Sequence, residues 1–484
     1  MRAPTRIDRR RFIAGSAAVA GGAALAGPFA GVIARPAGAA TPQPTLGPVA
    51  DLRDGVVRLW LPDGFAYRSF HDTESTVTLD DETILPGRHD GMAAFPGPDG
   101  NVVLVRNHEV NNPVPAFGDA GAAYDAMAGG GTTTIETTPH GEVIRAYTSL
   151  NGTQMNCAGG VMPWGSWVTC EETVNGPDVG ADFTGASNVP LTQRHGYVFE
   201  VPAGGQASRQ PITAAGRFAH EAVAYDPAGG ALYMTEDNFG FASGFYRYLP
   251  DDDPMAGGRL TDGGRLQMLA VAGVPEANLA AHQPDGATYP VVWVDIDDPD
   301  PTFPHTPGEP APTTNNTAIR YVGDQGRARG AAWFSRLEGA VYDRGLVYFT
   351  STQGGGQAES GPGPVGDGFG NGSGQVWAYD PASERLRLVF QSPGPDVLDL
   401  PDNVTTSRRG TLVLCEDSSG DNYVRGLSRH GQLWDIALNR LPGRFGDEFA
   451  GATFSPDGRT LFVNIQSGRG MTIAIWGPWG RIGV

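Results

Sequence analysis

Acidic side chains and cysteines stand at the ends of short apolar runs in several parts of this chain. The stretch NCAGGVMPWGSWVTCEET (Asn156–Thr173) contains Cys157 and Cys170, and Glu171 and Glu172 follow the second cysteine directly. A thiolate beside carboxylates could bind metal ions, because thiolates favour transition metals such as iron and carboxylates favour calcium. The two cysteines could instead form a disulfide across a hairpin, or serve as small buried apolar residues.

The pattern in this stretch occurs six times along the chain. An acidic or polar group opens a short strand, a turn with Pro or Gly follows, and a second apolar strand ends in a polar cluster. The repeats begin at Asp90, Asn156, His220, Leu337, Pro401 and Asp447. Most starts lie roughly fifty to seventy residues apart, which is typical of propeller blades with elaborated loops. We therefore predict an all-β fold, a six-bladed β-propeller with insertions between blades. A solenoid or a pair of sandwiches is the alternative, although either would leave strand edges that a closed ring removes.

Both polar clusters of each repeat should meet at one end of the predicted ring. Innermost propeller strands all run the same way along the central axis, and each second strand returns to the same mouth. The inner circle predicted in this way comprises Asp90, Cys157, Glu221, Glu338, Asp402 and Glu448. The second circle comprises Glu109, Glu171, Glu236, Glu416 and Asp417. Buried carboxylates in such numbers would repel one another, so the pattern indicates a cation site, although any single acid could merely cap a turn.

The composition limits the classes of ligand. The chain has 484 residues, a formal net charge of -19 and no lysine. An acidic protein of this kind is not expected to bind nucleic acid, because phosphate backbones require clustered positive charge. Without lysine there can be no Schiff-base chemistry, and arginine or metal ions must hold any anionic substrate.

The N-terminus has the features of an export signal. DRRRFIAG (Asp8–Gly15) contains the arginine pair of a twin-arginine signal, a mildly apolar run follows, and PAGAA (Pro36–Ala40) offers small residues for cleavage. We predict a signal peptide over residues 1–40, with a membrane anchor as the alternative. Residues 41–484 are predicted to form one propeller domain with an insertion around 251–325, and Val56–Asp72 could add an outer strand that closes the last blade.

Several stretches, in this order, resemble the PhoX-type alkaline phosphatases. They are RNHE, GGTTT, NCAGG with PWGSWVTCEET, GRFAHEA, SRLEGA, PDN, CED and EFAGATFSPDGRTLFVNIQ, and they extend over most of the chain beyond the signal. The resemblance implies a six-bladed propeller, twin-arginine export, an active site with ferric iron (Fe3+) and calcium ions, and hydrolysis of phosphomonoesters.

The resemblance also implies roles for individual residues. A cysteine and two glutamates would bind iron; the glutamates match Glu221 and Glu338, and the repeat register favours Cys157 over Cys170. Arg336 resembles the phosphate-binding arginine, and strand alternation would place it on the same side as Glu338, two residues later. The calcium ligands expected from the resemblance are Glu109, Glu171, Glu416 and Asp417.

These inferences predict an exported, metal-dependent phosphatase in which Arg336, Glu338 and Glu221 act on a small phosphomonoester. We expect a monomer that meets the twin-arginine translocase during export and no membrane after signal cleavage. Its expected location is periplasmic, extracellular or at the cell surface. A calcium-dependent propeller lactonase or diesterase, or a non-catalytic calcium-stabilised binding propeller, remains the alternative, since fold alone does not fix function.

Overall fold

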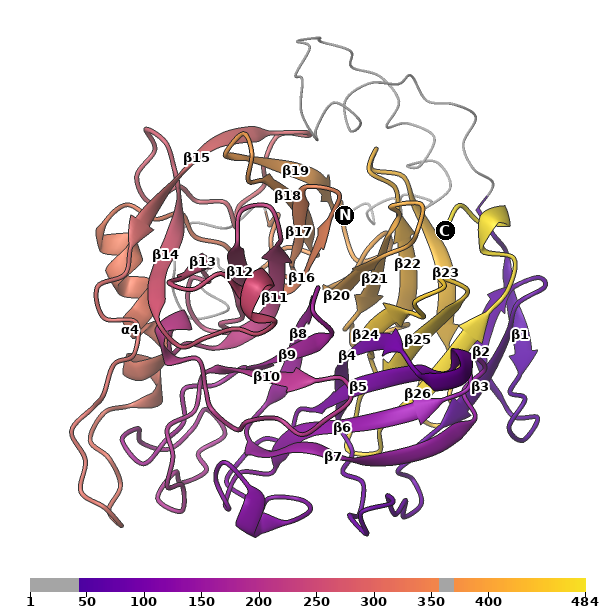
Figure 1. The fold of residues 1–484 in the computed structure, drawn as a ribbon. Coiled ribbons are helices and arrows are strands. Elements are labelled where there is room, and N and C mark those ends of the chain that lie inside the picture. The colour runs from indigo at the N-terminus through magenta and orange to yellow at the C-terminus, as the bar shows by residue number, and fades with distance from the viewer. Residues whose placement is uncertain (1–42, 357–369) are drawn as a thin grey trace, which may run out of the picture.

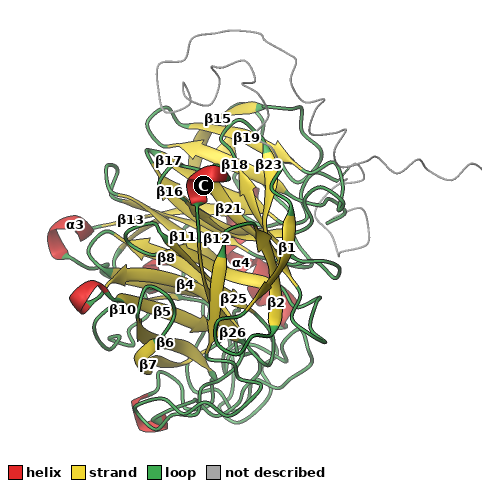
Figure 2. Ribbon diagram, turned by 90° about the vertical axis from the view of Figure 1, so that its right-hand side faces the viewer, coloured by secondary structure: helices red, strands yellow, loops and turns green. Residues whose placement is uncertain are grey.

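The computed structural model describes residues 43–356 and 370–484, which form an all-β protein with few helices. The sheets are arranged around a central axis, so the fold is propeller-like, as Figures 1 and 2 show from two sides. The all-β and propeller-like parts of the prediction are confirmed. The expected signal peptide lies outside the described residues. None of the helices found in the described ranges is long and apolar enough to cross a bilayer.

Six strands surround the central axis, and each begins at or within two residues of a predicted repeat start. They are β4 (His89–Pro96), β8 (Asn156–Met162), β11 (His220–Asp226), β16 (Leu337–Asp343), β20 (Pro401–Thr406) and β24 (Phe449–Phe454). Each of these inner strands contacts the next, and β24 contacts β4, so they close into a ring. Residues from all six line a cavity of about 280 Å³.

Each inner strand pairs antiparallel with the next strand in the sequence. These second strands are β5 (Val102–His108), β9 (Ser166–Glu171), β12 (Ala231–Glu236), β17 (Leu346–Ser351), β21 (Leu412–Glu416) and β25 (Thr460–Ile465). The third strands are β6 (Gly130–Thr137), β10 (Val198–Pro202), β13 (Phe245–Pro250), β18 (Gln375–Asp380), β22 (Tyr423–Leu427) and β26 (Met471–Trp476). The second strands therefore end at the same mouth of the ring at which the inner strands begin.

Outer strands extend these sheets. They are β7 (Val143–Thr153), β14 (Gly264–Val271), β15 (Thr288–Asp295), β19 (Arg385–Gln391) and β23 (Leu433–Asn439). Strand β15 pairs with both β14 and β19, which joins β11–β14 and β16–β19 into one nine-stranded sheet. The helices are α3 (Pro254–Gly257) and α4 (Asn315–Ala328), with 3-10 turns η1 (Pro98–Gly100), η2 (Ala120–Ala122), η3 (Thr213–Ala215) and η4 (Trp479–Arg481). The segment expected to be an insertion thus contains regular structure.

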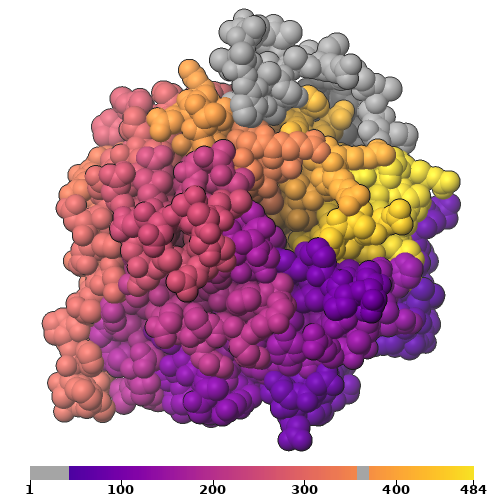
Figure 3. Space-filling view, in the orientation of Figure 1, coloured from indigo at the N-terminus to yellow at the C-terminus, as the bar shows by residue number. Residues whose placement is uncertain are grey.

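The N-terminal strands cover the edges of the C-terminal sheets. Strand β3 (Ala66–Phe70) pairs with β26, which confirms the outer strand expected from Val56–Asp72. Strands β1 (Leu46–Ala50) and β2 (Val57–Pro62) extend the neighbouring sheet through the pairing of β2 with β23. Figure 3 shows this contact as indigo atoms beside yellow ones. Pairing the two ends of the chain removes exposed strand edges.

The sequence of each strand reflects how many of its faces are covered. The second strand β17, LVYFTS, is buried at every position because sheets pack on both of its faces. The outer strand β19 alternates buried Leu386 and Leu388 with partly exposed Arg385 and Arg387. Apolar side chains from facing sheets fill the space between them, and each large side chain buried there contributes about 1.5–3 kcal/mol.

Candidate metal centre

A β-bulge near the start of five inner strands sets the direction of one side chain in each. At these points two residues of the inner strand oppose one residue of its partner. The first residue of each bulge is the acid or thiol of the predicted inner circle: Asp90, Cys157, Glu221, Glu338 and Asp402. A bulge leaves its extra residue outside the regular pairing and re-aims its side chain, which suits a ligand position.

The backbone just before four of these bulges is strained. The residue two positions before the acid or thiol has a left-handed conformation, at Arg88 (φ 49°), Met155 (φ 45°), Arg336 (φ 49°) and Leu400 (φ 48°). This conformation costs a non-glycine residue about 1–2 kcal/mol. Strain of this kind is concentrated at functional sites, where the surrounding structure must enforce it.

The second bulge residue is glycine in β4 and β16, where adjacent inner strands approach closely. A Cβ atom on Gly91 would lie 2.6 Å from Ala158 Cα, and one on Gly339 would lie 2.6 Å from Val404 N. Larger residues at either position would push neighbouring inner strands apart. The ring is therefore narrow enough for side chains from different sheets to share one site.

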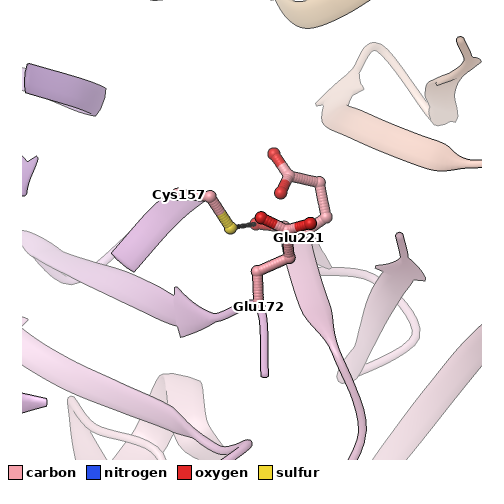
Figure 4. A group of neighbouring side chains, drawn as sticks. All are labelled: Cys157, Glu172 and Glu221. Carbon is pink, nitrogen blue, oxygen red and sulfur yellow. Dashed lines mark hydrogen bonds between the residues drawn. The ribbon is translucent and has the colours of Figure 1, made fainter. Parts of the chain in front are cut away.

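Two groups of potential metal ligands share one residue. Ligand atoms of Cys157, Glu172 and Glu221 lie within 4.8 Å of one another, and the same holds for Glu221, Glu338 and Asp402. Figure 4 shows Cys157 of β8, Glu221 of β11 and Glu172, the residue after β9, converging on one point. Glu221, which belongs to both groups, is only 2% exposed. The three predicted iron ligands therefore fall in these two groups, with Glu221 linking Cys157 to Glu338.

The electrostatics of this cluster suit cations. Burial, followed by the charges of Glu338 and Asp402, raises the pKa of Glu221 well above its usual value. Burial and Asp417 raise the pKa of Asp402 to about 8. Burial and Glu221 likewise raise the pKa of the Cys157 thiol. Bound cations would reverse these effects, since an opposite charge favours the ionised form of each ligand.

Further acids from both predicted circles lie near these two ligand groups. Burial raises the pKa of Glu109, although Arg88 opposes the shift through an ion pair. Burial and Asp417 raise the pKa of Glu448 well above its usual value. Asp90 has a buried oxygen, Oδ1, with no hydrogen-bond partner among the described residues. An unpartnered carboxylate oxygen next to other acids is the environment expected for an oxygen ligand of a hard cation.

Arg336 contacts Glu338 as expected, but a backbone turn and not strand alternation brings the two side chains together. Its Nη2 donates to Glu338 Oε1 at 2.7 Å and to Asp237 Oδ2 at 2.8 Å. Arg336 precedes β16 and has left-handed backbone, so strand alternation does not explain its direction. Burial lowers the pKa of Arg336, but Asp237 and Glu338 outweigh it and raise the pKa well above its usual range. Asp237 is not among the site residues predicted from the sequence.

Glu171 and Glu416, both expected to bind calcium, have their oxygens occupied by protein donors. The Glu171 carboxylate accepts from His195 Nδ1 and from the backbone N–H groups of Gln154, Gly196 and Tyr197. The Glu416 carboxylate accepts from Arg425 Nε and from the backbone N–H groups of Asp399 and Tyr423. Neither residue belongs to the two groups of potential ligands found in the described ranges. Each carboxylate thus connects the end of its own strand, β9 or β21, to neighbouring backbone segments.

Glu172, rather than Glu171, contributes the carboxylate beside Cys157. The last residue of β9 is Glu171, which pairs with Asn156, and Glu172 follows outside the strand. Glu109 and Asp417 occupy the same position, one residue after β5 and β21. Because successive side chains point in opposite directions, only one of two adjacent acids can face the axis. Glu172 aligns with Glu109 and Asp417 in the sequence, but the strand register decides that this position, and not that of Glu171, faces the axis.

The Glu171 site predicts a pH effect on stability. His195 is fully buried, with Nδ1 2.6 Å from Glu171 and Nε2 3.8 Å from Asp125. Burial lowers the pKa of His195, but these acids outweigh it and raise the pKa to about 9. The stabilisation is complete below about pH 6.5 and is lost as pH rises through about 9.

We therefore expect thermal unfolding of the wild type to shift downward between pH 6 and 10 by more than that of His195→Gln. Glutamine cannot become charged, so the variant lacks this component, which amounts to a few kcal/mol. Scanning calorimetry at several pH values measures the difference. His430→Gln, a change at an exposed histidine, is the control and should follow the wild type. Parallel curves for wild type and His195→Gln would contradict the assignment.

All three cysteines are free and buried, so the disulfide alternative for Cys157 and Cys170 is wrong. Cys157 Sγ lies 3.3 Å from the backbone oxygen of His220 and 3.7 Å from that of Glu221. Cys170 packs within an apolar core, where burial raises its pKa. Only Cys157 belongs to the ligand groups identified in the described part of the chain.

The fold and site together define a propeller-like protein with a cluster of buried acids, one thiol and an arginine at one end of its inner strands. Its sequence matches the family model for alkaline phosphatase PhoX over residues 45–145 and 128–468, so the chain belongs to the PhoX family. It is therefore a phosphoester hydrolase of the alkaline phosphatase type. No curated protein matches it by sequence.

One solved structure supports the fold. The structure of Pseudomonas fluorescens PhoX in complex with vanadate, a transition state analogue, is similar with a TM-score of 0.63 and 18% identity. The match covers 90% of this chain and 97% of that one. A gluconolactonase from Xanthomonas campestris is also found, at a TM-score of 0.37 and 13% identity, covering 90% of this chain and 99% of that one.

Proposed function

We propose that this protein is an exported phosphatase that hydrolyses phosphomonoesters at an iron and calcium cluster in the channel of a six-bladed propeller. The blade count treats the nine-stranded sheet as two blades joined by β15. The observation that carries the proposal is the meeting of both ligand groups at Glu221, with Arg336 adjacent. The vanadate complex of Pseudomonas fluorescens PhoX supports phosphoryl transfer in a fold of this kind.

The donor set supports two kinds of cation. Cys157 would bind iron together with Glu172, Glu221 and Glu338, because a thiolate favours a transition metal. Glu109 and Asp417 would bind calcium, with Asp90 and Glu448 beside them as further oxygen ligands. Glu171 and Glu416 are not included, since protein donors already occupy their oxygens.

Arg336 would bind and orient the substrate. Its Nε and Nη2 atoms bond to Asp237 and Glu338, while no hydrogen bond within the described ranges uses Nη1. A guanidinium held in this way keeps its charge and offers a donor of fixed direction to a phosphate oxygen. When bound, the cations would neutralise phosphoryl charge and lower the pKa of water.

The proposal also includes export. The arginine pair at Arg9 and Arg10 and the small residues of Pro36–Ala40 support a twin-arginine signal over residues 1–40. Residues 41–484 would then fold as one propeller domain before translocation, with the metals installed. The mature protein would act outside the cytoplasm.

Metal analysis and turnover together test the proposal. Protein made through the twin-arginine route should contain iron and calcium, and should release p-nitrophenol from p-nitrophenyl phosphate. Chelation of calcium should abolish the release. Calcium without iron would favour a lactonase or a binding propeller instead. If metal-loaded protein turned over no phosphomonoester, the proposed function would be wrong.

The two cysteines of the hairpin β8–β9 give a matched pair of variants. Cys157→Ser is expected to lose iron and any visible thiolate-to-iron absorption, because serine replaces the thiolate with a hydroxyl. Cys170→Ser should keep both, since its side chain packs in the core. Elemental analysis and visible absorption of the purified variants measure the effect. Equal iron content in the two variants would contradict the assignment of Cys157.

A further inference from the structure

Two exposed phenylalanines lie next to the arginine of the candidate site. The ring of Phe239 covers Arg336, with the guanidinium carbon 4.3 Å from the ring centroid. The ring of Phe183 lies 6.2 Å from that of Phe239, at an interplanar angle of 36°. Phe183 is 62% exposed and Phe239 is 46% exposed. Large apolar side chains are usually buried, so two adjacent exposed rings beside an anion-binding group indicate a recognition role.

The loop that carries Phe239 is held at its start and again at Phe241. It connects β12 to β13, and it begins with Asp237, whose N–H donates to Ala219 O at 3.1 Å and whose carboxylate binds Arg336. Further along this loop, Phe241 lies under Arg320 of α4, 4.9 Å from the guanidinium carbon. The bond between Asp237 and Arg336 therefore fixes the start of this loop to the arginine that the Phe239 ring covers.

The loop that carries Phe183 is held by a separate turn. Asp182 Oδ1 accepts from the N–H groups of Thr184 and Ala186, at 2.8 and 2.9 Å. Thr184 Oγ1 lies 2.9 Å from Asn112 Oδ1, which belongs to another loop. Phe183 therefore projects from a fixed turn, and little conformational entropy is lost when a ligand contacts its ring.

We propose that Phe183 and Phe239 form an aromatic subsite that binds a planar ring in the leaving group of the substrate. The proposal rests on the proposed phosphatase function and names a substrate class for it: phosphomonoesters of alcohols that carry an aromatic ring close to the ester oxygen. Because the Phe239 ring lies against Arg336, a phosphate bound by this arginine would bring its ester oxygen near the two phenylalanines, and a ring one carbon away could stack on them. Hydrolysis forms a P–O bond to water and breaks the P–O bond to the alcohol, which leaves with a proton from that water.

Three esters with similar leaving-group chemistry separate stacking from simple apolar contact. Benzyl, cyclohexylmethyl and ethyl phosphate release alcohols of similar acidity, but only the first carries a planar aromatic ring. We expect the wild type to have a kcat/KM for benzyl phosphate roughly threefold or more above that for cyclohexylmethyl phosphate, because aromatic pairs prefer defined stacking geometries. The kcat/KM for ethyl phosphate should be roughly tenfold below that for benzyl phosphate.

Two variants and a control locate this preference. Phe183→Leu leaves the ring on Arg336 in place and should lower the benzyl-to-ethyl ratio severalfold, while Phe183→Leu combined with Phe239→Leu should bring it to within about twofold of one. Trp60→Leu is the control, because Trp60 is also an exposed aromatic beside an arginine, Arg440, but lies on the outer strand β2. It should leave the ratio unchanged.

The outcomes for the subsite and for the phosphatase function are distinguishable. If all three esters were hydrolysed with the same kcat/KM, or if neither phenylalanine variant changed the ratio, the subsite would be refuted and the phosphatase function would stand. If no ester were hydrolysed, the phosphatase function would fail. Calorimetry with benzylphosphonate and ethylphosphonate would then decide the subsite: tighter binding of the benzyl compound, weakened by Phe183→Leu, supports it, and equal binding refutes it.

Discussion

Glu221→Gln is expected to remove the metal ions and to lower phosphatase activity by about a thousandfold or more. Glu221 is the one residue present in both groups of potential ligands within the described ranges. Its carboxylate should therefore bind cations on both sides, and an amide there would weaken the whole cluster rather than one position. Elemental analysis and the rate of p-nitrophenyl phosphate hydrolysis measure the two effects.

The same substitution should stabilise the metal-free protein. Burial and the neighbouring acids raise the pKa of Glu221 in the folded state, so its ionisation at neutral pH opposes folding. The metal-free wild type should lose stability as pH rises above about 4.5, because the Glu221 carboxyl then ionises readily in the unfolded chain but only at a cost in the folded state. The neutral amide of Glu221→Gln has no such cost. We expect the metal-free variant to melt about 1–3 °C above the metal-free wild type at pH 7.

Glu236→Gln is the matched control. Glu236 is also buried, on the partner strand β12, and accepts from Gly244 N–H and Tyr246 OH through one oxygen. A glutamine oxygen can accept both bonds, so metal content and activity should remain close to those of the wild type. If Glu221→Gln kept its metals, or if both variants lost them equally, Glu221 would not be the shared ligand.

Exchanging either of the adjacent acids Glu171 and Glu172 for glutamine should give opposite results. Glu172→Gln is expected to lose metal and activity while the fold is retained, because Glu172 lies beside Cys157 and Glu221. Glu171→Gln is expected to keep metal-binding geometry but to destabilise the fold by about 3–5 kcal/mol, since it breaks a buried pair with His195. The amide NH2 of the new glutamine would also face backbone N–H groups that the carboxylate accepts from, which adds to the loss of stability.

Metal content and thermal unfolding, measured on both variants, give the test. The expected pattern is low metal with a near-normal melting temperature in the metal-free state for Glu172→Gln, and near-stoichiometric metal with a lowered melting temperature for Glu171→Gln. Loss of metal only from Glu171→Gln would restore the assignment expected from the sequence. Each variant serves as the control of the other, because the chemical change is identical at neighbouring positions.

The repeat pattern was sufficient to predict the fold class and much of the candidate site. Six strand pairs with polar ends predicted an all-β propeller, and the structure places an inner strand at or near each repeat start. The inner-circle residues Cys157, Glu221, Glu338 and Asp402 do converge. This was predictable because every repeat places its acid or thiol at the same position relative to its own strand, and a closed ring brings equivalent positions together.

The sequence by itself determined the strand order, the end of the ring at which the acids meet, and the family to which the chain is similar. Only the tertiary structure decided which of two adjacent acids faces the axis, because a one-residue difference in strand register reverses every side chain. The pairing of Glu171 with Asn156 leaves Glu172, and not Glu171, beside Cys157. The left-handed backbone at Arg336 turns its side chain toward Glu338. The tertiary structure also brought Phe183 and Phe239 together from separate loops. Such contacts between separate loops leave no periodic signal in a sequence, because they depend on how neighbouring sheets pack.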